Sequence, residues 1–373
     1  MIYADYAATT PVDEDVLREM LPYFNECFYN QSSTHAGGRV SSAAVEEARS
    51  TIAKIINADK NEIYFTSGGT ESDNWAIKGV ASKFPKGHII TSVIEHHAVL
   101  NCCKELEEKG YEITYVPVDK YGIIDIDFLK KSIKENTCLI SVMTVNNEIG
   151  TIQPISEIAA IAKENNVYFH TDAAQAMGKI DIDVEKDDIT MLSFTAQKFF
   201  GPKGIGVLYI KNGTKISNIF FGGAQERDRR PGTVNTPLVV GMASALKKAV
   251  ENRLLYTEKV KKYADIIKEI VFSELDNVSL NGHPQMTVPN ILNFSFGGIQ
   301  IEGLLLLLDI DGICCSAGAA CSAGALKISH VLQALDKDSS GGLRISLSHL
   351  NTEQEARMIG NALVKNVKKL RGI

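Results

Sequence analysis

The 373-residue sequence predicts an α/β protein with a mainly parallel sheet, followed by a smaller α+β part. Two observations lead to this prediction. Short apolar runs of strand length alternate with amphipathic segments of helix length up to about residue 210, and the alternation stops near Pro237. Strands that alternate with helices usually pair in parallel, because each helical connection crosses back over the sheet.

The elements of the first part follow from hydrophobic periodicity. Apolar residues recur at helical spacing from Val45 to Ile56, and a second helix is expected at residues 155–165. Seven strands are predicted at residues 62–66, 88–92, 111–116, 138–144, 167–171, 189–194 and 206–210.

The second part has a different pattern. A long helical stretch rich in Lys, Glu, Ala and Leu runs from Pro237 to about Leu275, and strands are expected at residues 291–296 and 343–347. The small-residue stretch 316–325 is interpreted as a loop. We therefore expect a large α/β domain at residues 14–250 and a small α+β domain formed by residues 1–13 and 251–373.

Composition excludes several classes of protein. The 39 Lys+Arg against 45 Asp+Glu give a net charge of −6 without a basic run, so direct nucleic-acid or anionic-membrane binding is not expected. The N-terminus lacks a secretory signal, and the aliphatic run Leu304–Leu308 is too short to cross a membrane. The seven cysteines show no Cys-x-x-Cys spacing, which argues against a disulfide framework and a metal site and favours a cytoplasmic location.

The stretch Thr66-Ser67-Gly68-Gly69-Thr70-Glu71-Ser72 follows a strand and precedes a helical pattern. Glycines allow backbone N–H groups to approach an anion, and a helix N-terminus favours negative charge, so a phosphate site is one interpretation. An ordinary capped turn is the other, and from this motif alone it is at least as well supported.

Two further side chains lie directly after predicted strands. Asp172 would pair with a cationic ring nitrogen at the ligand-binding edge of the sheet, or would simply cap the following segment. Lys198 lies in an apolar stretch, where desolvation makes an amine nucleophilic, whereas Lys203 fits the turn Gly-Pro-Lys-Gly. An anion loop, a carboxylate and a lysine are together the protein's share of pyridoxal-phosphate chemistry.

Three other candidates are weaker individually. His96 and His97 follow the strand 88–92 and would stack on a flat cofactor or cap a surface helix. Cys321 lies among Gly, Ala and Ser residues, as a solvent-reachable nucleophile requires, whereas Cys27, Cys102, Cys103 and Cys138 are expected to be buried. Arg344, in an alternating strand, suits bidentate capture of a carboxylate.

These motifs together resemble the cysteine desulfurases of the NifS/IscS-like type, which are fold type I pyridoxal-phosphate enzymes of the class V aminotransferase family. The resemblance runs nearly end to end and includes, among others, the segments 5–11, 66–74, 145–150, 170–175, 222–226 and 230–233.

The resemblance implies a role for each matching residue. Lys198 would bind pyridoxal 5'-phosphate covalently, Asp172 would pair with its ring nitrogen, Gln175 would contact its ring hydroxyl and His96 would stack on the ring. The phosphate would be held by Gly69, Thr70, Thr195 and Gln197, joined by Thr233 of a second subunit in a homodimer. Asn147 and Arg344 would bind the substrate carboxylate, and Cys321 would carry a persulfide.

The implied reaction converts L-cysteine to L-alanine, with Lys198 or His96 as the base, and passes the sulfur to acceptor proteins for iron–sulfur clusters, thiolated tRNA or cofactors. The sequence departs from the family pattern at Gln197, where His is usual, at Val234, where Glu is common, and at Gln31, where Asn-Pro is usual, and the cysteine loop has Ala in place of Ser. The alternatives are a selenocysteine lyase or class V transaminase, which need no loop thiol, and a scaffold paralogue of low activity.

Overall fold

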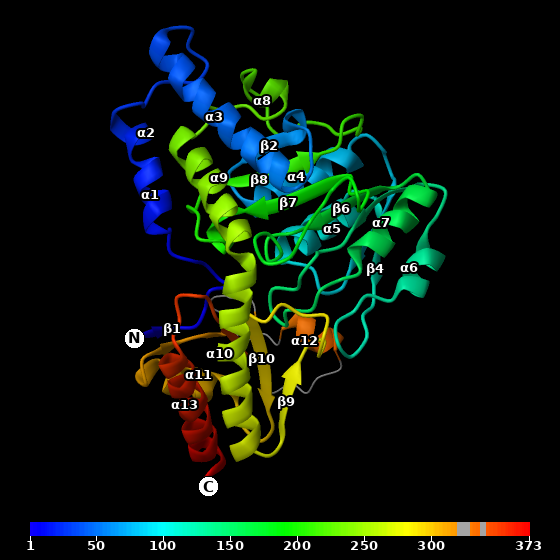
Figure 1. Cartoon of the computed structure of the whole chain (residues 1–373). Coiled ribbons are helices and arrows are strands. Elements are labelled where there is room, and N and C mark those ends of the chain that lie inside the picture. The colour runs from blue at the N-terminus through cyan, green and yellow to red at the C-terminus, as the bar shows by residue number, and fades with distance from the viewer. Residues whose placement is uncertain (319–328, 336–340) are drawn as a thin grey trace.

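The computed structural model describes residues 1–318, 329–335 and 341–373 (Figure 1). A large α/β part forms the upper region of the view, and a smaller α+β part forms the lower region, where both chain ends lie. The long helix α10, Arg253–Glu274, descends alongside the small part. Within the described ranges, no helix combines the length and apolarity that crossing a bilayer requires.

A seven-stranded sheet is the centre of the large part, with the strand order β2-β8-β7-β6-β5-β3-β4. All neighbours pair in parallel except β8, which is antiparallel to both β2 and β7. The mainly parallel sheet predicted from the sequence is therefore confirmed. The strands are β2 Ile63–Thr66, β3 His88–Ser92, β4 Glu112–Val116, β5 Thr137–Ser141, β6 Tyr168–Asp172, β7 Met191–Thr195 and β8 Gly206–Ile210.

Helices cover the sheet because each buries one apolar stripe. In α3, Ala36–Ile55, the residues Val45, Ala48 and Ile52 face the core, and His35 caps the N-terminus. The helix therefore begins nine residues before the predicted Val45. The other helices here are α1 Glu14–Met20, α2 Pro22–Asn25, α4 Gly69–Ala81, α5 His97–Glu108, α6 Ile126–Ser132, α7 Ile155–Glu164, α8 Gln225–Asp228 and α9 Thr236–Glu251, with the 3₁₀ turns η1 Lys60–Glu62 and η2 Ala196–Lys198.

The small part contains a four-stranded sheet of order β12-β13-β10-β9 and a short pair of β1 with β11. Its strands are β1 Ile2–Tyr3, β9 Val278–Asn281, β10 Ile291–Phe296, β11 Ile313–Cys314, β12 Ser316–Ala317 and β13 Leu343–Ser346. Helices α10, α11 Ile301–Ile310, α12 His330–Ala334 and α13 Glu353–Arg371 accompany them.

Two sequence predictions for this part were wrong in detail. The helix expected from Pro237 to Leu275 is two helices, because Asn252, with φ −101° and ψ 5°, interrupts the helical backbone between α9 and α10. The stretch 316–325 is not entirely a loop, since Ser316 and Ala317 pair with β13. This pairing places the start of the stretch beside Arg344.

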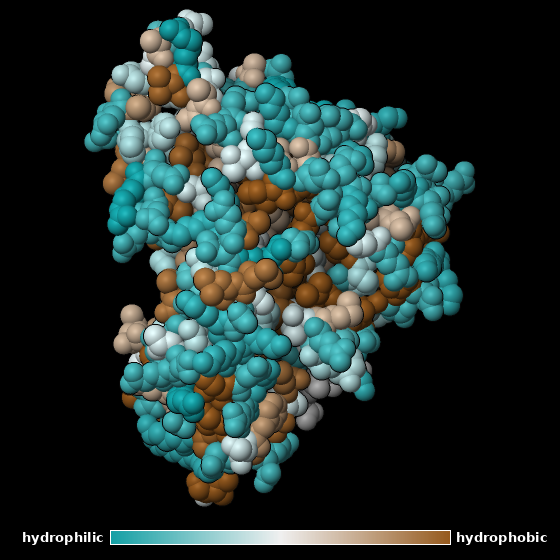
Figure 2. Space-filling view, viewed as in Figure 1, coloured by the Kyte–Doolittle hydropathy of each residue, from teal (hydrophilic) through white to brown (hydrophobic). Residues whose placement is uncertain are grey.

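The buried apolar residues form separate clusters. One surrounds the large sheet and includes Val45, Ile140 and Phe194, and another lies between the small sheet and helices α10, α11 and α13. The second cluster also contains Ile2 and Ala4 from the N-terminal segment. These clusters support the proposed division into a large domain and a small domain that recruits the chain's first residues. In Figure 2, apolar residues gather toward the middle of the face shown, where the two parts meet.

Candidate active site

All the predicted site residues except Thr233 and Cys321 line one cavity of about 210 Å³ between the two parts. The cavity lies at the carboxyl ends of β6 and β7, where a parallel sheet commonly binds ligands. Its walls are Ala7, Ala8, Gly69, Thr70, Asp73, His96, Met143, Val145, Asn147, Asp172, Ala174, Gln175, Thr195, Gln197, Lys198 and Arg344.

Lys198 occupies the turn η2 immediately after β7. Its Nζ donates to the backbone oxygens of Ala7 (2.8 Å) and Ala8 (2.7 Å), so the N-terminal segment holds the amine in place. Lys203, by contrast, is exposed in the following turn, as the sequence predicted. The structure therefore offers Lys198, and not Lys203, to the cavity.

Asp172 ends β6 and is buried, with Oδ1 accepting a hydrogen bond from the N–H of Ala174 at 2.8 Å. Burial raises the pKa of its carboxyl, while the nearby His96 and Lys198 favour the charged form. A buried carboxyl of this kind gains from a cation placed against it. Asp172 does not cap a helix, because a turn follows, but its bond to the Ala174 N–H does cap that turn.

Asp73, on the second turn of α4, also faces the cavity, and its buried Oδ1 lacks a hydrogen-bond partner among the described residues. Burial and the negative charge of Asp172 raise its pKa well above the usual range. Glu95 lies near both and has a pKa of about 8 because of burial. Asp172, Asp73 and the neighbouring Glu95 therefore form a cluster of buried acids that cannot all be charged together.

His96 precedes α5 and caps it, since its Nδ1 accepts from the N–H of Ala98 at 3.1 Å. With Nδ1 accepting, the neutral ring carries its proton on Nε2. Burial lowers the pKa of His96, so the neutral form predominates at pH 7. His96 therefore caps its helix, as one sequence interpretation predicted, and also lines the cavity, while its stacking on a cofactor stays a prediction.

Another part of the cavity wall suits an anion. Gly68 provides no side-chain cap for α4, so the first N–H groups of this helix, beginning at Gly69, are available where Thr70 and Gln197 also line the wall. The Thr195 hydroxyl donates to the Ile205 oxygen at 2.9 Å, so it would have to rotate in order to donate to a phosphate.

Gln175 is held from two sides. Its Nε2 donates to the Ala7 oxygen at 2.9 Å, and its Oε1 accepts from Lys179 Nζ at 2.9 Å. Only one N–H of the amide remains for a cofactor oxygen, which agrees with the single contact that the sequence resemblance implies.

Arg344 lies on β13 with a side chain 2% exposed. Its guanidinium donates to the Asn147 backbone oxygen at 3.0 Å and to Asp5 Oδ1 at 2.8 Å, while its Nε has no partner among the described residues. An arginine already held on two sides presents a fixed fork to a carboxylate. Asn147 thus contributes its backbone to this fork and lines the same cavity.

Two predicted residues lie elsewhere. Thr233 is exposed on the loop after α8, which the Arg230–Glu71 ion pair (2.8 Å) fixes to the first turn of α4. Cys321 lies outside the described residues. Among the other cysteines, Cys102, Cys103 and Cys138 are buried as predicted, but Cys27 is only half-buried because it follows the short surface helix α2.

The donor set fits pyridoxal phosphate. The start of α4, which has no side-chain cap and would suit the phosphate, lines the same cavity as the buried carboxyl of Asp172 and the Lys198 amine. The Asp73 Oδ1 atom has no hydrogen bond among the described residues, although His170 Nε2 lies 3.7 Å from it, so this wall of the cavity is polar.

Sequence reasoning missed three contributors: Asp73, Asp5 and Lys179. Asp73 belongs to the helix after the phosphate-type loop, and its position one turn from Gly69 was the available signal. Asp5 and Lys179 gave none, because their partners Arg344 and Gln175 are brought to them only by the fold.

Comparisons with known proteins agree with this geometry. The Aminotransferase class-V family model matches residues 2–359. Cysteine desulfurase IscS of Clostridium botulinum is 47% identical, covering 99% of this chain and 95% of that protein, and cysteine desulfurase IscS of Methanosarcina thermophila is 48% identical, covering 100% and 93%.

A solved NifS-like protein superposes with a TM-score of 0.93 at 38% identity, covering 99% of this chain and 100% of the other. A solved structure described as SspA in complex with cysteine gives 0.85 at 37% identity, covering 93% and 99%. With the fold, the cavity and these relatives in agreement, the chain belongs to the class-V aminotransferase family, among its cysteine desulfurases.

Proposed function

We propose that this cysteine desulfurase binds pyridoxal 5'-phosphate at Lys198 and moves the sulfur of L-cysteine to Cys321. The observation that carries the proposal is the convergence of Lys198, Asp172 and Arg344 on one cavity. A lysine, a ring-nitrogen partner and a carboxylate anchor are what an amino-acid substrate requires of such an enzyme.

When bound, pyridoxal phosphate withdraws electrons from the substrate Cα and so stabilises the loss of its proton. The chain would hold the phosphate with the start of α4, Thr70, Thr195 and Gln197, and with Thr233 of a second subunit in a homodimer. Asp172 would face the ring nitrogen, Gln175 would donate to the ring hydroxyl and His96 would cover the ring.

The substrate would be oriented by its carboxylate. Arg344 and Asn147 lie on the same wall, and the Arg344 guanidinium is held by Asp5 and by the Asn147 oxygen. A fixed anchor restricts the direction in which the Cα–H bond points, which is what allows one base to remove that proton.

Lys198 and His96 both line the cavity, and each can accept a proton when neutral. Burial holds His96 in the neutral form, but its Nδ1 already accepts from the Ala98 N–H and its Nε2 carries the proton. His96 would have to break this cap to accept another proton, so Lys198 is the favoured base. Whenever it is not bound to the cofactor, the Lys198 amine would be held by the oxygens of Ala7 and Ala8.

The sulfur step balances without an external oxidant. The Cys321 thiolate attacks the substrate sulfur, the S–S bond forms as the substrate C–S bond breaks, and the carbon takes the electron pair and a proton to become L-alanine. The persulfide sulfur then passes to an acceptor protein for iron–sulfur clusters or thio-cofactors. We place this chemistry in the cytoplasm.

The experiment is to measure alanine release from L-cysteine by the pure, cofactor-loaded protein, with Lys198→Ala as the inactive reference. Borohydride reduction followed by peptide mapping should find the cofactor on Lys198, with Lys203→Ala leaving the labelling unchanged. Label on Lys203, or no alanine from L-cysteine while selenocysteine is turned over, would contradict the proposal.

A further inference from the structure

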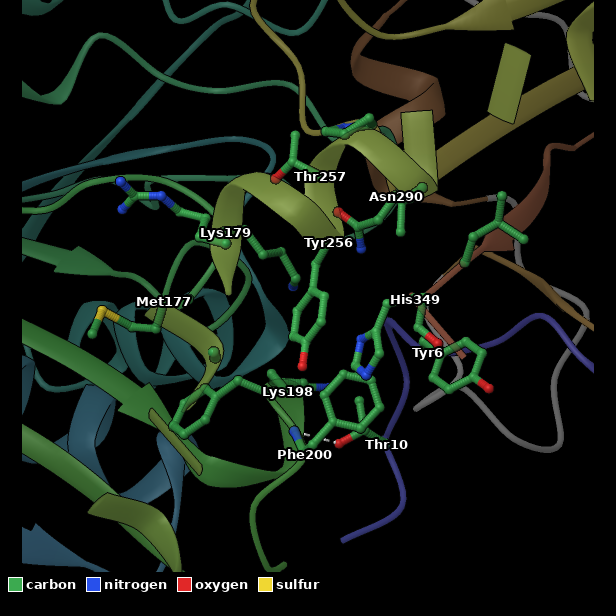
Figure 3. Close-up of a pocket in the computed structure, with 18 residues that line it drawn as sticks. Tyr6, Thr10, Met177, Lys179, Lys198, Phe200, Tyr256, Thr257, Asn290 and His349 are labelled. Carbon is green, nitrogen blue, oxygen red and sulfur yellow. Dashed lines mark hydrogen bonds between the residues drawn. The ribbon is translucent and has the colours of Figure 1, made fainter. Parts of the chain in front are cut away.

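Lys198 also lines a second cavity, of about 70 Å³, which we call the rear cavity and which neither Asp172 nor His96 lines (Figure 3). Lys198 is the one titratable side chain shared by both cavities among the described residues. The walls of the rear cavity come from the N-terminal segment, the turn after β6, η2, α10 and the segment after β13. They include Tyr6, Thr10, Met177, Lys179, Phe200, Tyr256, Thr257, Asn290 and His349.

Lys179 connects this rear cavity to the active site through hydrogen bonds. Its Nζ donates to the backbone oxygen of Gln175 at 3.0 Å and to Gln175 Oε1 at 2.9 Å. The Gln175 amide donates in turn to the Ala7 oxygen, at 2.9 Å, which also accepts from Lys198 Nζ at 2.8 Å. The two lysines are therefore linked through one glutamine and one carbonyl.

A lysine has hydrogen-bond donors only, when it is charged. Gln175 must therefore present its oxygen to Lys179, which leaves its NH₂ group facing Ala7 and the active-site cavity. Lys179 therefore determines which way the Gln175 amide points, and with it whether the amide can donate to a ring hydroxyl.

The charges around Lys179 add a second constraint. The titratable groups that line the rear cavity with it are Tyr6, Lys198, Arg253, Tyr256 and His349, with no carboxylate among the described lining residues. Arg253 is already paired with Asp181, and burial lowers the pKa of His349 to about 4, so this ring is neutral at pH 7.

Burial and the nearby Lys198 lower the pKa of Lys179 to about 7. The effect is mutual, because two like charges oppose each other equally. Near neutral pH, a proton on one lysine nitrogen therefore disfavours a proton on the other.

We propose that Lys179 is a positioning residue of this enzyme, which orients the Gln175 amide toward the cofactor and, when charged, opposes a positive charge on the Lys198 nitrogen. The inference rests on the proposed roles of Gln175 and Lys198. It predicts two separate consequences, one of hydrogen bonding and one of charge.

Two variants separate these consequences. Lys179→Met removes both the donor and the charge, whereas Lys179→Arg keeps a donor and makes the charge permanent. Lys203→Met is the matched control, because Lys203 is exposed and lines neither cavity. For each cofactor-loaded protein, we would titrate the visible absorption of the bound cofactor with pH and measure the dissociation constant of pyridoxal phosphate, kcat and KM.

In Lys179→Met, the pH at the midpoint of the cofactor's absorption change should rise by roughly one unit, because a positive charge near the Lys198 nitrogen has been removed. In Lys179→Arg the midpoint should fall. Pyridoxal phosphate should bind several-fold more weakly to the Met variant, with much of this loss restored in the Arg variant, and kcat should change more than KM. Lys203→Met should match the native protein.

Unchanged midpoints and unchanged cofactor affinity in both Lys179 variants would overturn the inference. Shifts in the same direction for Met and Arg would overturn its charge component. A failure of the proposed function is distinguishable, because the native protein would then neither retain pyridoxal phosphate nor release alanine. If the Met variant does not fold, the direction of the shift in the Arg variant decides.

Discussion

Arg344, the anchor proposed for the substrate carboxylate, is paired with Asp5, whose Oδ1 lies 2.8 Å from the guanidinium. The pair joins β13 to the N-terminal segment, and Ser316 donates to the other Asp5 oxygen at 2.8 Å. Arginine is thus fixed, but part of its charge is neutralised before a substrate arrives. Asp5 therefore orients the Arg344 guanidinium but weakens its attraction for the substrate carboxylate.

Asp5→Asn tests this balance. The amide keeps the size of the carboxyl and one accepting oxygen for Arg344, but it removes the negative charge near the substrate carboxylate. We expect KM for L-cysteine to fall a few-fold, equivalent to roughly 1 kcal/mol, and the melting temperature to fall as well.

Steady-state kinetics and thermal unfolding measure both effects. The conservative variant Asp311→Asn, at an exposed ion pair with Lys365, controls for loss of a surface carboxylate. A tenfold rise in KM for Asp5→Asn would mean that orientation of the guanidinium by Asp5 outweighs its charge.

Cys321→Ser should separate cofactor chemistry from sulfur transfer. The variant should still bind L-cysteine and change the visible absorption of the cofactor, because the thiol acts only after the substrate is activated. Persulfide formation and alanine release should be lost. Mass spectrometry of the cysteine-treated protein measures the added sulfur directly.

Cys315 is the appropriate comparison in that experiment, with Cys315→Ser as the variant. Burial raises the pKa of its thiol to about 12, so the reactive thiolate is scarce at neutral pH. Cys315→Ser should therefore keep persulfide formation. Normal turnover in Cys321→Ser would instead assign the sulfur to Cys314 or Cys315.

The part of the site that could be predicted from the sequence is local. Lys198 and Asp172 each follow a strand, and the helix start at Gly69 follows another, so a parallel sheet brings them to one edge. The strand bounds at His88–Ser92 and Gly206–Ile210 were predicted to the residue, because both are short, buried and flanked by turn residues.

The rest depends on contacts between distant segments. Lys179 next to Gln175, four residues apart, follows no pattern that distinguishes it from an exposed lysine. The pairing of Asp5 with Arg344, 339 residues away, requires the first strand to lie beside the small sheet. No periodicity in the sequence predicts that these two residues lie side by side.

The buried carboxyl of Glu95 predicts a pH dependence of stability. Its pKa is raised from 4.5 to about 8 by burial, although Ser92 and the N–H of Met143 donate to it. A raised pKa in the folded state means that the unfolded chain loses its proton first as pH rises. This contribution to stability is therefore complete below about pH 4.5 and is lost progressively up to about pH 8.

Glu95→Gln removes this titration while keeping an accepting oxygen. The decline in the free energy of unfolding between about pH 4.5 and pH 8 should become shallower than in the native protein. Urea unfolding of both proteins across this range measures the difference. An equally steep decline in the variant would show that other groups, such as Asp73, dominate.

Gln197 provides the last prediction, since it lines the cavity where we propose that the phosphate binds, at a position where the family resemblance implies His. Its amide can donate to a phosphate oxygen, but it cannot carry a positive charge. A charge-assisted hydrogen bond is roughly twice as strong as a neutral one, so the native glutamine should lose on the order of 1 kcal/mol. Gln197→His should therefore bind pyridoxal phosphate a few-fold more tightly and change the desulfurase rate modestly. Equilibrium dialysis and alanine release measure the two quantities. A rise in activity by several orders of magnitude from a negligible native rate would instead favour a scaffold protein.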